Sequence, residues 1–235
     1  MSYSVTREEI MKIAADCAVL PLEMTGAPTE GRAAQSLYRA GGDALHTALR
    51  KLHFLPVGSA AALEAEGLAF PHLIGTTVPR WLTGKCNELL TLSRCYEAVF
   101  ATAEELGCRR LVLPFLATCY YRFPKEEAIH IALREADKWR GEAVFSADTE
   151  ELLRISAVPY RKPRILSYVG YYRDHAIFSL DNGQYARVDL RPERQSVDTV
   201  PYIEACFRKG VDPLQEPLPE AEIARLRQIY EEIDG

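Results

Sequence analysis

The sequence predicts an α/β protein: a three-layer α/β/α domain with a mixed sheet, followed by a small β-hairpin and helix unit. Apolar runs of strand length alternate with helical patterns through the first two thirds of the chain, which is typical of a sheet covered on both faces. Proline-rich, basic residues 158–164 then precede three strand-like segments. We therefore predict two domains, residues 1–157 and residues 158–235.

The composition is that of a folded protein with a sizeable core. The chain has 235 residues, of which 48% are hydrophobic and 26% charged, and its net charge is −5. This balance predicts neither a nucleic-acid partner nor an anionic membrane surface, and no apolar run is long enough to span a bilayer. The N-terminus lacks the charged-then-apolar plan of a signal peptide, so we expect a cytoplasmic protein.

The cysteines do not predict a metal centre. None of the six cysteines forms a C-x-x-C pair, and the histidines do not cluster with them. A disulfide framework is not expected in a chain of this size without a secretion signal. We predict no metal and no cofactor.

The first third of the chain contains a short helix, a strand and a longer helix. Thr6 and Glu9 have the spacing of a capping box, which predicts a short helix after Thr6. Residues 17–22 are a buried strand that ends at Pro21, and residues 23–32 have the composition of a loop. A helical pattern then begins at Ala33 and is weakened or interrupted by Gly41 and Gly42.

The next segments alternate between strand and helix. Residues 56–70 are small and irregular, and residues 70–78 have a strand pattern. The clearest helix has an apolar stripe from Leu89 to Leu106 and stops at Gly107.

The central stretch, residues 111–124, predicts a strand, a loop and a helix start. An apolar run from Leu111 indicates a buried strand, and residues 117–122 are small, polar and aromatic. Pro124 with acidic residues behind it is typical of a helix N-terminus. In an open α/β sheet, ligands bind at the carboxyl ends of strands, and a helix start favours an anion. We therefore predict a phosphate-bearing ligand over residues 117–122.

The remaining segments complete both predicted domains. A helix after Pro124 ends at Gly141, and residues 142–146 form a further strand. Beyond the basic linker, we predict strands at residues 165–172, 176–180 and 185–190. Asp181-Asn-Gly183 predicts a tight hairpin turn between the last two, and a C-terminal helix has one apolar stripe that reaches Ile233.

The order of these segments resembles that of the macro domains, a family that binds ADP-ribose. The resemblance covers residues 5–155 and is carried by five matching segments: Asp16-Cys-Ala-Val19, Ser36-Leu-Tyr-Arg-Ala-Gly-Gly42, His72-Leu-Ile-Gly-Thr-Thr-Val-Pro-Arg-Trp81, the helical segment from Glu88 to Gly107, and Leu111-Val-Leu-Pro-Phe115 with Phe123-Pro124. It implies a macro-like fold for residues 1–157. It also implies ADP-ribose or an ADP-ribosylated protein as the partner.

The resemblance implies a set of ligand contacts. Asp16 matches the acid that hydrogen-bonds the adenine amino group, and Gly31 matches the glycine-rich catalytic loop. The family's diphosphate loop falls on residues 117–122, where Cys119 and Arg122 replace its two glycines. The implied ligand-binding residues are Asp16, Cys17, Gly31, Ala117, Thr118, Cys119, Tyr120, Tyr121 and Arg122.

Several of these residues have a second interpretation. Asp16 could instead satisfy backbone groups before a strand. Arg122 could grip a phosphate, fold into the cleft and close it, or pair with Glu126. Cys119 could be a nucleophile with a pKa lowered by the helix start, or an inert thiol, since no histidine is placed beside it by the sequence.

The resemblance leaves three functions open. The first is binding of ADP-ribose or a related nucleotide without efficient hydrolysis, because the family's two amides fall on Leu20 and Glu23 and its catalytic-loop Asp on Ala34. The second is an interaction module with a closed cleft, with a protein partner or a second copy bound through the C-terminal unit. The third is an ADP-ribosyl-protein or O-acetyl-ADP-ribose hydrolase that uses substitute residues such as Glu23, Glu30 or Cys119.

Overall fold

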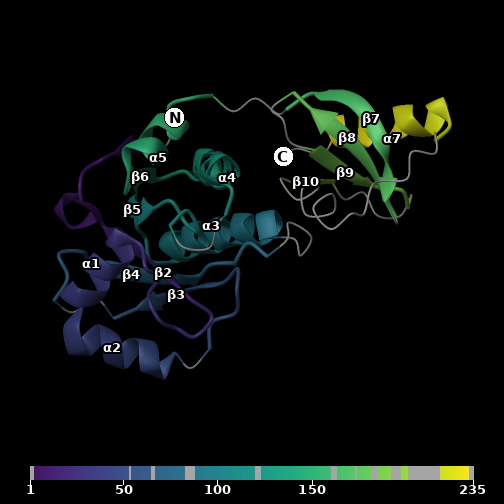
Figure 1. Cartoon of the computed structure of the whole chain (residues 1–235). Helices are drawn as coiled ribbons and strands as arrows, with labels where there is room; N and C mark the ends of the chain where they lie inside the picture. Colours follow the sequence, from purple (N-terminus) through teal and green to yellow (C-terminus); the bar gives the residue numbers. More distant parts are fainter. Residues whose placement is uncertain are drawn as a thin grey trace. The chain divides into compact units, whose positions relative to one another are not determined.

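The chain forms two compact units, one made by most of residues 1–159 and the other by most of residues 160–235 (Figure 1). We describe each unit by itself. The computed structural model describes residues 3–52, 54–64, 67–82, 88–119, 123–159, 163–172, 174–181, 185–191, 197–200 and 218–232.

A mixed sheet forms the centre of the first unit, with the strand order β1-β6-β5-β2-β4-β3. Neighbouring strands are parallel except for the β3–β4 pair, which is antiparallel. The strands are β1 (Tyr3–Thr6), β2 (Cys17–Leu22), β3 (Ala60–Leu63), β4 (His72–Thr77), β5 (Arg110–Pro114) and β6 (Glu142–Ser146). The predicted mixed sheet is confirmed.

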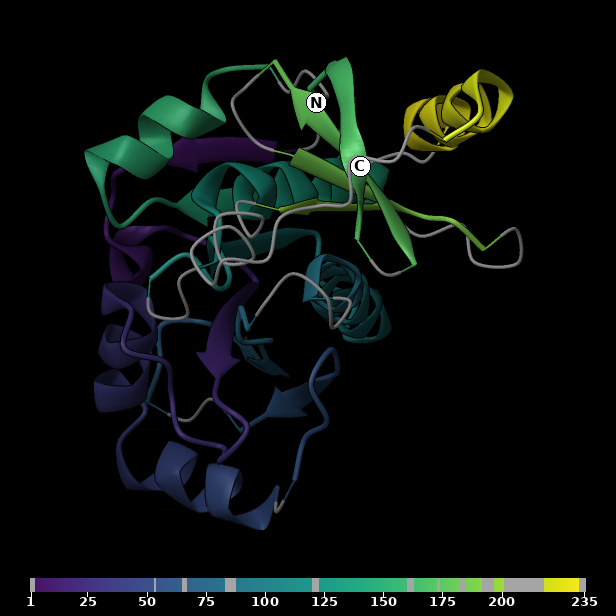
Figure 2. The same cartoon turned by 45° about the vertical axis from the view of Figure 1, so that its right-hand side comes forward.

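Helices cover both faces of this sheet, as Figures 1 and 2 show. One face packs against α3 (Glu88–Glu105), α4 (Lys125–Lys138) and α5 (Glu150–Ser156). The other packs against the 3-10 helix η1 (Ile10–Lys12), α1 (Arg32–Ala40) and α2 (Gly42–Lys51).

The residues of β2 show why the sequence produces three layers. Successive side chains of a strand point to opposite faces, and every residue of β2 is buried. Cys17 and Val19 join the core beside α3, whereas Ala18 and Leu20 join the core beside α1. A continuous apolar run of this kind fits only a strand covered on both sides, and the predicted three-layer class is confirmed.

Two helices end at the glycines that were predicted to end them. The chain breaks between α1 and α2 at Gly42, whose φ of +51° is a left-handed conformation that suits glycine. Gly107, with φ of +72°, follows the end of α3 and allows the N–H of Cys108 to reach the carbonyl of Ala103 at 2.9 Å. Both predicted interruptions are confirmed.

Three predictions for the N-terminal half are wrong or incomplete. The predicted capping box does not start an α-helix: the Thr6 hydroxyl accepts the N–H of Glu8 at 3.1 Å, and only the short η1 follows. Strand β1 was not predicted, and neither was β3 inside the segment expected to be irregular. Both are short strands at the edges of the sheet that are defined by pairing with a distant partner.

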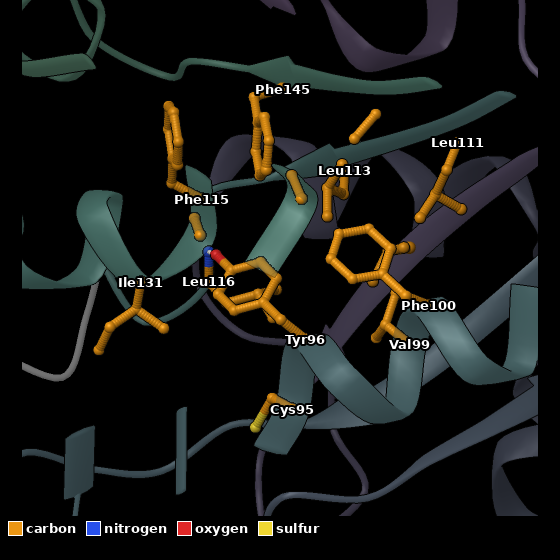
Figure 3. Packing of buried hydrophobic residues seen from close by; sticks show 14 of the residues in the cluster. Cys95, Tyr96, Val99, Phe100, Leu111, Leu113, Phe115, Leu116, Ile131 and Phe145 are labelled. Atoms are coloured by element: carbon orange, nitrogen blue, oxygen red, sulfur yellow. Dashed lines mark hydrogen bonds between the residues drawn. The ribbon is translucent and has the colours of Figure 1, made fainter. Parts of the chain in front are cut away.

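Aromatic and aliphatic side chains from α3, β5 and β6 fill the core beneath the predicted loop (Figure 3). The ring of Tyr96 is fully buried, and its centroid lies 6.4 Å from that of Phe145. The Tyr96 hydroxyl accepts a hydrogen bond from the N–H of Leu116 at 2.8 Å. This bond ties α3 to the residues that follow β5.

The second unit is an antiparallel sheet with one helix packed on it. The strand order is β10-β9-β8-β7, and Leu226 and Tyr230 of α7 pack against Phe178 and Val188. The elements are β7 (Ile165–Tyr172), β8 (His175–Leu180), β9 (Tyr185–Asp189), β10 (Val197–Val200) and α7 (Glu220–Glu232). The predicted strands and helix are confirmed and β10 is additional, while Asn182, Gly183 and Ile233 lie outside the described residues. Among the described helices, none has the length and apolarity needed to cross a bilayer.

Candidate functional site

A narrow hollow lies where three neighbouring parallel strands, β2, β5 and β6, reach their carboxyl ends. Its walls include Pro21 at the end of β2, Phe115 and Ala117 after β5, and Asp148 after β6. Gly31, the residue before α1, closes it from the other side of the sheet. The space in it that can hold a water is only about 20 Å³, which is room for about one molecule.

The segment after β5 holds a strained backbone. Ala117 has a φ of 63°, and among the described residues it is the one non-glycine with a positive φ. An L-residue in this conformation costs about 1–2 kcal/mol, and such strain concentrates at functional sites. The Thr118 hydroxyl donates to the carbonyl of Phe115 at 2.9 Å and stabilises the tight turn. Both residues belong to the ligand loop predicted from the sequence, and in the structure Ala117 lines the hollow while Thr118 stabilises the turn.

The Tyr96 hydroxyl binds the backbone of the segment after β5, so removing this hydroxyl should destabilise the turn. We expect Tyr96→Phe to lower the free energy of unfolding by about 1–2 kcal/mol, because the buried N–H of Leu116 would lose its acceptor. Tyr3→Phe is a matched control, since Tyr3 also packs edge-on against Phe145 but is only half-buried. Urea denaturation followed by tryptophan fluorescence measures both variants, and equal stabilities would contradict this support.

Gly31 lets the loop before α1 approach the segment after β5. A Cβ atom added at Gly31 would lie 3.2 Å from the Cys119 Sγ and 3.5 Å from an Asp148 carboxylate oxygen. A Cβ atom here would already crowd the Cys119 sulfur, and a branched side chain would extend the crowding toward Asp148. The predicted site residues Gly31, Ala117 and Cys119 therefore line one hollow.

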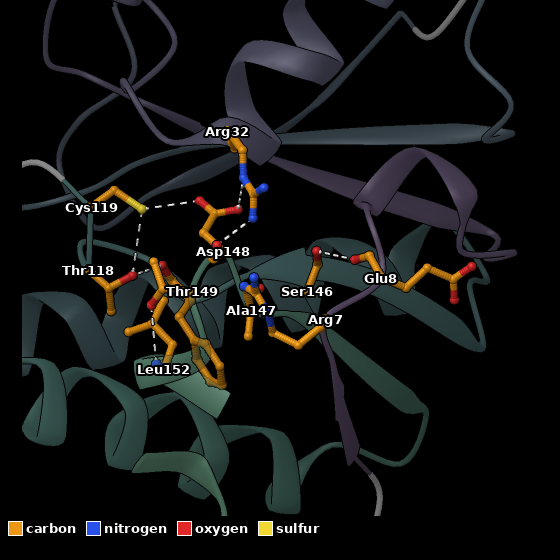
Figure 4. Close-up of polar contacts among 11 residues, drawn as sticks. Arg7, Glu8, Arg32, Thr118, Cys119, Ser146, Ala147, Asp148, Thr149 and Leu152 are labelled. Atoms are coloured by element: carbon orange, nitrogen blue, oxygen red, sulfur yellow. Dashed lines mark hydrogen bonds and ion pairs between the residues drawn. The ribbon is translucent and has the colours of Figure 1, made fainter. Parts of the chain in front are cut away.

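A set of polar contacts spans the mouth of this hollow, and we name it the Arg32–Asp148–Cys119 bridge (Figure 4). The Arg32 guanidinium donates to the backbone carbonyl of Asp148, and its Nε lies 3.9 Å from the Asp148 Oδ1. The Cys119 thiol donates to the Asp148 Oδ2 at 3.3 Å. Arg32 and Asp148 were not among the predicted ligand-binding residues. The available signal was that Asp148 lies two residues after the predicted strand 142–146, at the sheet edge where ligands bind.

Cys119 is a poor nucleophile in this arrangement. Although Cys119 is an exposed residue, partial desolvation of its thiol, followed by the charge and hydrogen bond of Asp148, raises the pKa of Cys119 to about 11. This direction is opposite to the lowered pKa that the nucleophile interpretation requires, and it fits the alternative of an inert thiol. The polar contacts of the thiol are with Asp148 and Thr118, so neither contact supplies a histidine that could act as its base.

Asp16 and Cys17 lie at the opposite end of the strands. The Asp16 Oδ2 accepts the backbone N–H groups of Arg109 and Arg110, both at 2.8 Å, and these bonds lower the pKa of Asp16. Cys17 is fully buried at the start of β2. Since a strand rises about 3.3 Å per residue, the length of β2 separates this pair from the hollow. The structure thus gives Asp16 the backbone-satisfying role that was its second interpretation.

The structure shows the surroundings of Leu20, Glu23 and Ala34, the positions where the family's polar residues are replaced. Leu20 is fully buried in the core, and Ala34 lines the hollow. The Glu23 carboxylate lies 3.8 Å from the Arg80 guanidinium. Tyr120, Tyr121 and Arg122 lie outside the described residues, so the roles considered for them stay predictions. The described residues contain no group of three or more His, Cys, Asp or Glu side chains that could hold a metal ion.

The fold is an α/β domain, and its hollow lies at the carboxyl edge of a mixed sheet, which is where open α/β folds bind their ligands. A model of the macro domain family matches residues 15–132, about half of the chain. The chain belongs to the macro domain family.

Known relatives align with part of the chain. A macro domain-containing protein of Mesorhizobium japonicum is 34% identical over 98 residues, which are 42% of this chain and 56% of that protein. The O-acetyl-ADP-ribose deacetylase 1 of Pantoea vagans is 28% identical over 137 residues, which are 55% of this chain and 78% of that protein. The match thus spans little more than half the length of the Mesorhizobium relative.

Solved structures show the same fold. The Oceanobacillus iheyensis macrodomain with ADP superposes with a TM-score of 0.60 at 19% identity, over 66% of this chain and 87% of that chain. The Trypanosoma brucei macrodomain in complex with ADP-ribose superposes with a TM-score of 0.59 at 17% identity, over 66% of this chain and 67% of that chain.

Proposed function

We propose that the hollow binds the diphosphate of ADP-ribose or of a related nucleotide. The observation that carries this proposal is the convergence of the strained turn at Ala117 with Gly31 at the carboxyl ends of β2, β5 and β6. Gly31 precedes α1 without a side-chain cap, so the first N–H groups of this helix are available to an anion. The relatives described with ADP and ADP-ribose support the same ligand class.

We propose further that hydrolysis is inefficient. A hydrolase must position and activate a water beside the bound ligand. Leu20 and Ala34 carry no polar group, and the raised pKa of Cys119 keeps its thiol protonated near neutral pH. The Glu23 carboxylate is engaged by Arg80. Release of ADP-ribose from a modified protein at the rate of a known hydrolase would contradict this part of the proposal.

Calorimetric titration with ADP-ribose tests the binding proposal. We expect wild-type protein to bind, and Gly31→Val to bind at least about tenfold more weakly, because the added side chain would displace Cys119 and Asp148. Ala40→Val is the control, since it adds an apolar side chain at the exposed far end of α1. Absence of heat with wild-type protein up to roughly millimolar ligand would contradict the proposal.

A second candidate is an interaction module whose ligand cleft is closed. The observation that favours it is the small size of the hollow, about 20 Å³, which is far below the space that a nucleotide needs. In this case ADP-ribose would give no heat with wild-type protein or with variants that open the hollow. The proposed binding function instead requires that the walls of the hollow separate when the ligand enters.

A further inference from the structure

We propose that Asp148 is an internal anion that occupies the phosphate position on Arg32, so that the Arg32–Asp148–Cys119 bridge gates the hollow. A phosphate group of the ligand would open this gate by replacing the Asp148 carboxylate beside the Arg32 guanidinium. The inference rests on the proposed function and adds to it a residue that limits affinity, Asp148, and a residue that contacts phosphate, Arg32.

The bridge lies where a ligand would have to enter. It joins the start of α1, the turn after β5 and the turn after β6, which are the segments that surround the hollow (Figure 4). The Asp148 side chain is only 13% exposed, and it lines the hollow itself. While it stays there, it narrows the entrance and places a negative charge beside any phosphate that approaches.

Arg32 is the cationic partner of Asp148, and its exposed side chain is free to change rotamer. Its side chain is 62% exposed and extends from the first residue of α1, directly after Gly31. A guanidinium presents a planar set of N–H donors that matches phosphate as well as carboxylate. The same group can therefore hold Asp148 in the ligand-free protein and a phosphate in the complex, with a change of side-chain rotamer.

The bridge is weak enough to exchange. The Arg32 Nε to Asp148 Oδ1 distance of 3.9 Å is at the long end of an ion pair, and Arg32 is largely exposed to water. The thiol of Cys119 is a weak hydrogen-bond donor. A phosphate carries more charge and more acceptor oxygens than the carboxylate, so it should displace Asp148 from Arg32.

The test is a titration with ADP-ribose of four proteins: wild type, Asp148→Asn, Arg32→Gln and the double variant. Asp148→Asn keeps the shape of the side chain and removes its charge, and we expect about tenfold tighter binding. Arg32→Gln should bind about tenfold more weakly. In the double variant, the gain from Asp148→Asn should shrink, because the two residues act on each other. Glu150→Gln is the control. Glu150 lies two residues after Asp148, but its exposed carboxylate pairs with Arg7, so this variant should leave the affinity within about twofold.

The outcomes separate the gate from the proposed function. If wild-type protein binds ADP-ribose and Asp148→Asn binds equally or more weakly, Asp148 is not a gate but the binding function stands. If none of the four proteins binds, the binding function fails and the gate with it. If Asp148→Asn binds and wild-type protein does not, Asp148 limits access as inferred, but the binding function proposed for the wild-type protein is contradicted. Thermal unfolding followed by tryptophan fluorescence checks that each variant is folded.

Discussion

Replacing Glu135 with alanine is expected to lower the free energy of unfolding of the first unit by about 2 kcal/mol at pH 7, the typical cost of losing hydrogen bonds to a charged group whose cationic partners Arg134 and Lys138 still reach water. The Glu135 side chain is only 1% exposed. It accepts hydrogen bonds from the Ser93 hydroxyl at 2.9 Å, the Arg134 Nε at 3.0 Å and the Lys138 Nζ at 2.7 Å. The variant would remove the acceptor that links α4 to α3, and the buried Ser93 hydroxyl would lose the group to which it donates, keeping only the Arg134 guanidinium that donates to it at 3.3 Å.

The contribution of Glu135 to the free energy of unfolding should depend on pH. Burial raises the pKa of Glu135, but the hydrogen bonds from Lys138, Ser93 and Arg134 outweigh it, so the pKa lies below its ordinary value. A lowered pKa in the folded state stabilises the protein above the pKa of the unfolded chain, about 4.3. The difference between wild-type protein and Glu135→Ala should therefore shrink as the pH falls from about 4 through the lower, folded-state pKa.

Tryptophan fluorescence during urea denaturation isolates this effect, because both tryptophans, Trp81 and Trp139, belong to the first unit. Asp137→Ala is the matched control, since Asp137 lies on the exposed face of the same helix. It should change stability by less than about 0.5 kcal/mol. A loss of equal size in both variants would show that the buried contacts of Glu135 do not stabilise the unit.

The second large effect concerns the reactivity of Cys119. With a pKa of about 11, only about 0.1% of this thiol is ionised at pH 8, and thiolate is the form that reacts with iodoacetamide. Asp148→Asn removes the negative charge that raises this pKa and replaces the strong carboxylate acceptor by an amide, whose NH2 group can donate to a thiolate. We expect alkylation of Cys119 at pH 8 to become about tenfold faster in the variant, since the gain in thiolate exceeds its loss of nucleophilicity.

Mass spectrometry of the Cys119 peptide over a pH series measures this rate. The buried thiols of Cys17, Cys95 and Cys108 are internal references that should stay slow in both proteins. Glu150→Gln again serves as the charge control, and it should not change the rate. If Cys119 of wild-type protein reacted with a midpoint near pH 8.5, the ordinary value for a free thiol, the contact with Asp148 would be too weak to raise its pKa.

The sequence by itself determined the elements whose signals are local. The apolar run of β2 predicts a strand buried on both faces, and the apolar stripe of α3 predicts a helix with one buried side. The turn after β5 was likewise placed at the carboxyl end of a strand. Each of these predictions depends on residues that are close together in the chain, so periodicity and turn chemistry suffice, whereas Gly31 was assigned to the ligand site only by the resemblance to the macro domains.

Only the tertiary structure decided the features that depend on distant residues. Strands β1 and β3 exist because they pair with β6 and β4, and neither short segment carries a strong pattern of its own. Asp16 seemed to belong to the ligand site because it adjoins a matching segment, but the length of β2 places it at the far end of the sheet. Arg32 and Asp148 are 116 residues apart and meet only because β6 lies two strands from β2, with both strands ending at the same edge. Such contacts are set by how strands are ordered in the sheet, which local sequence patterns do not encode.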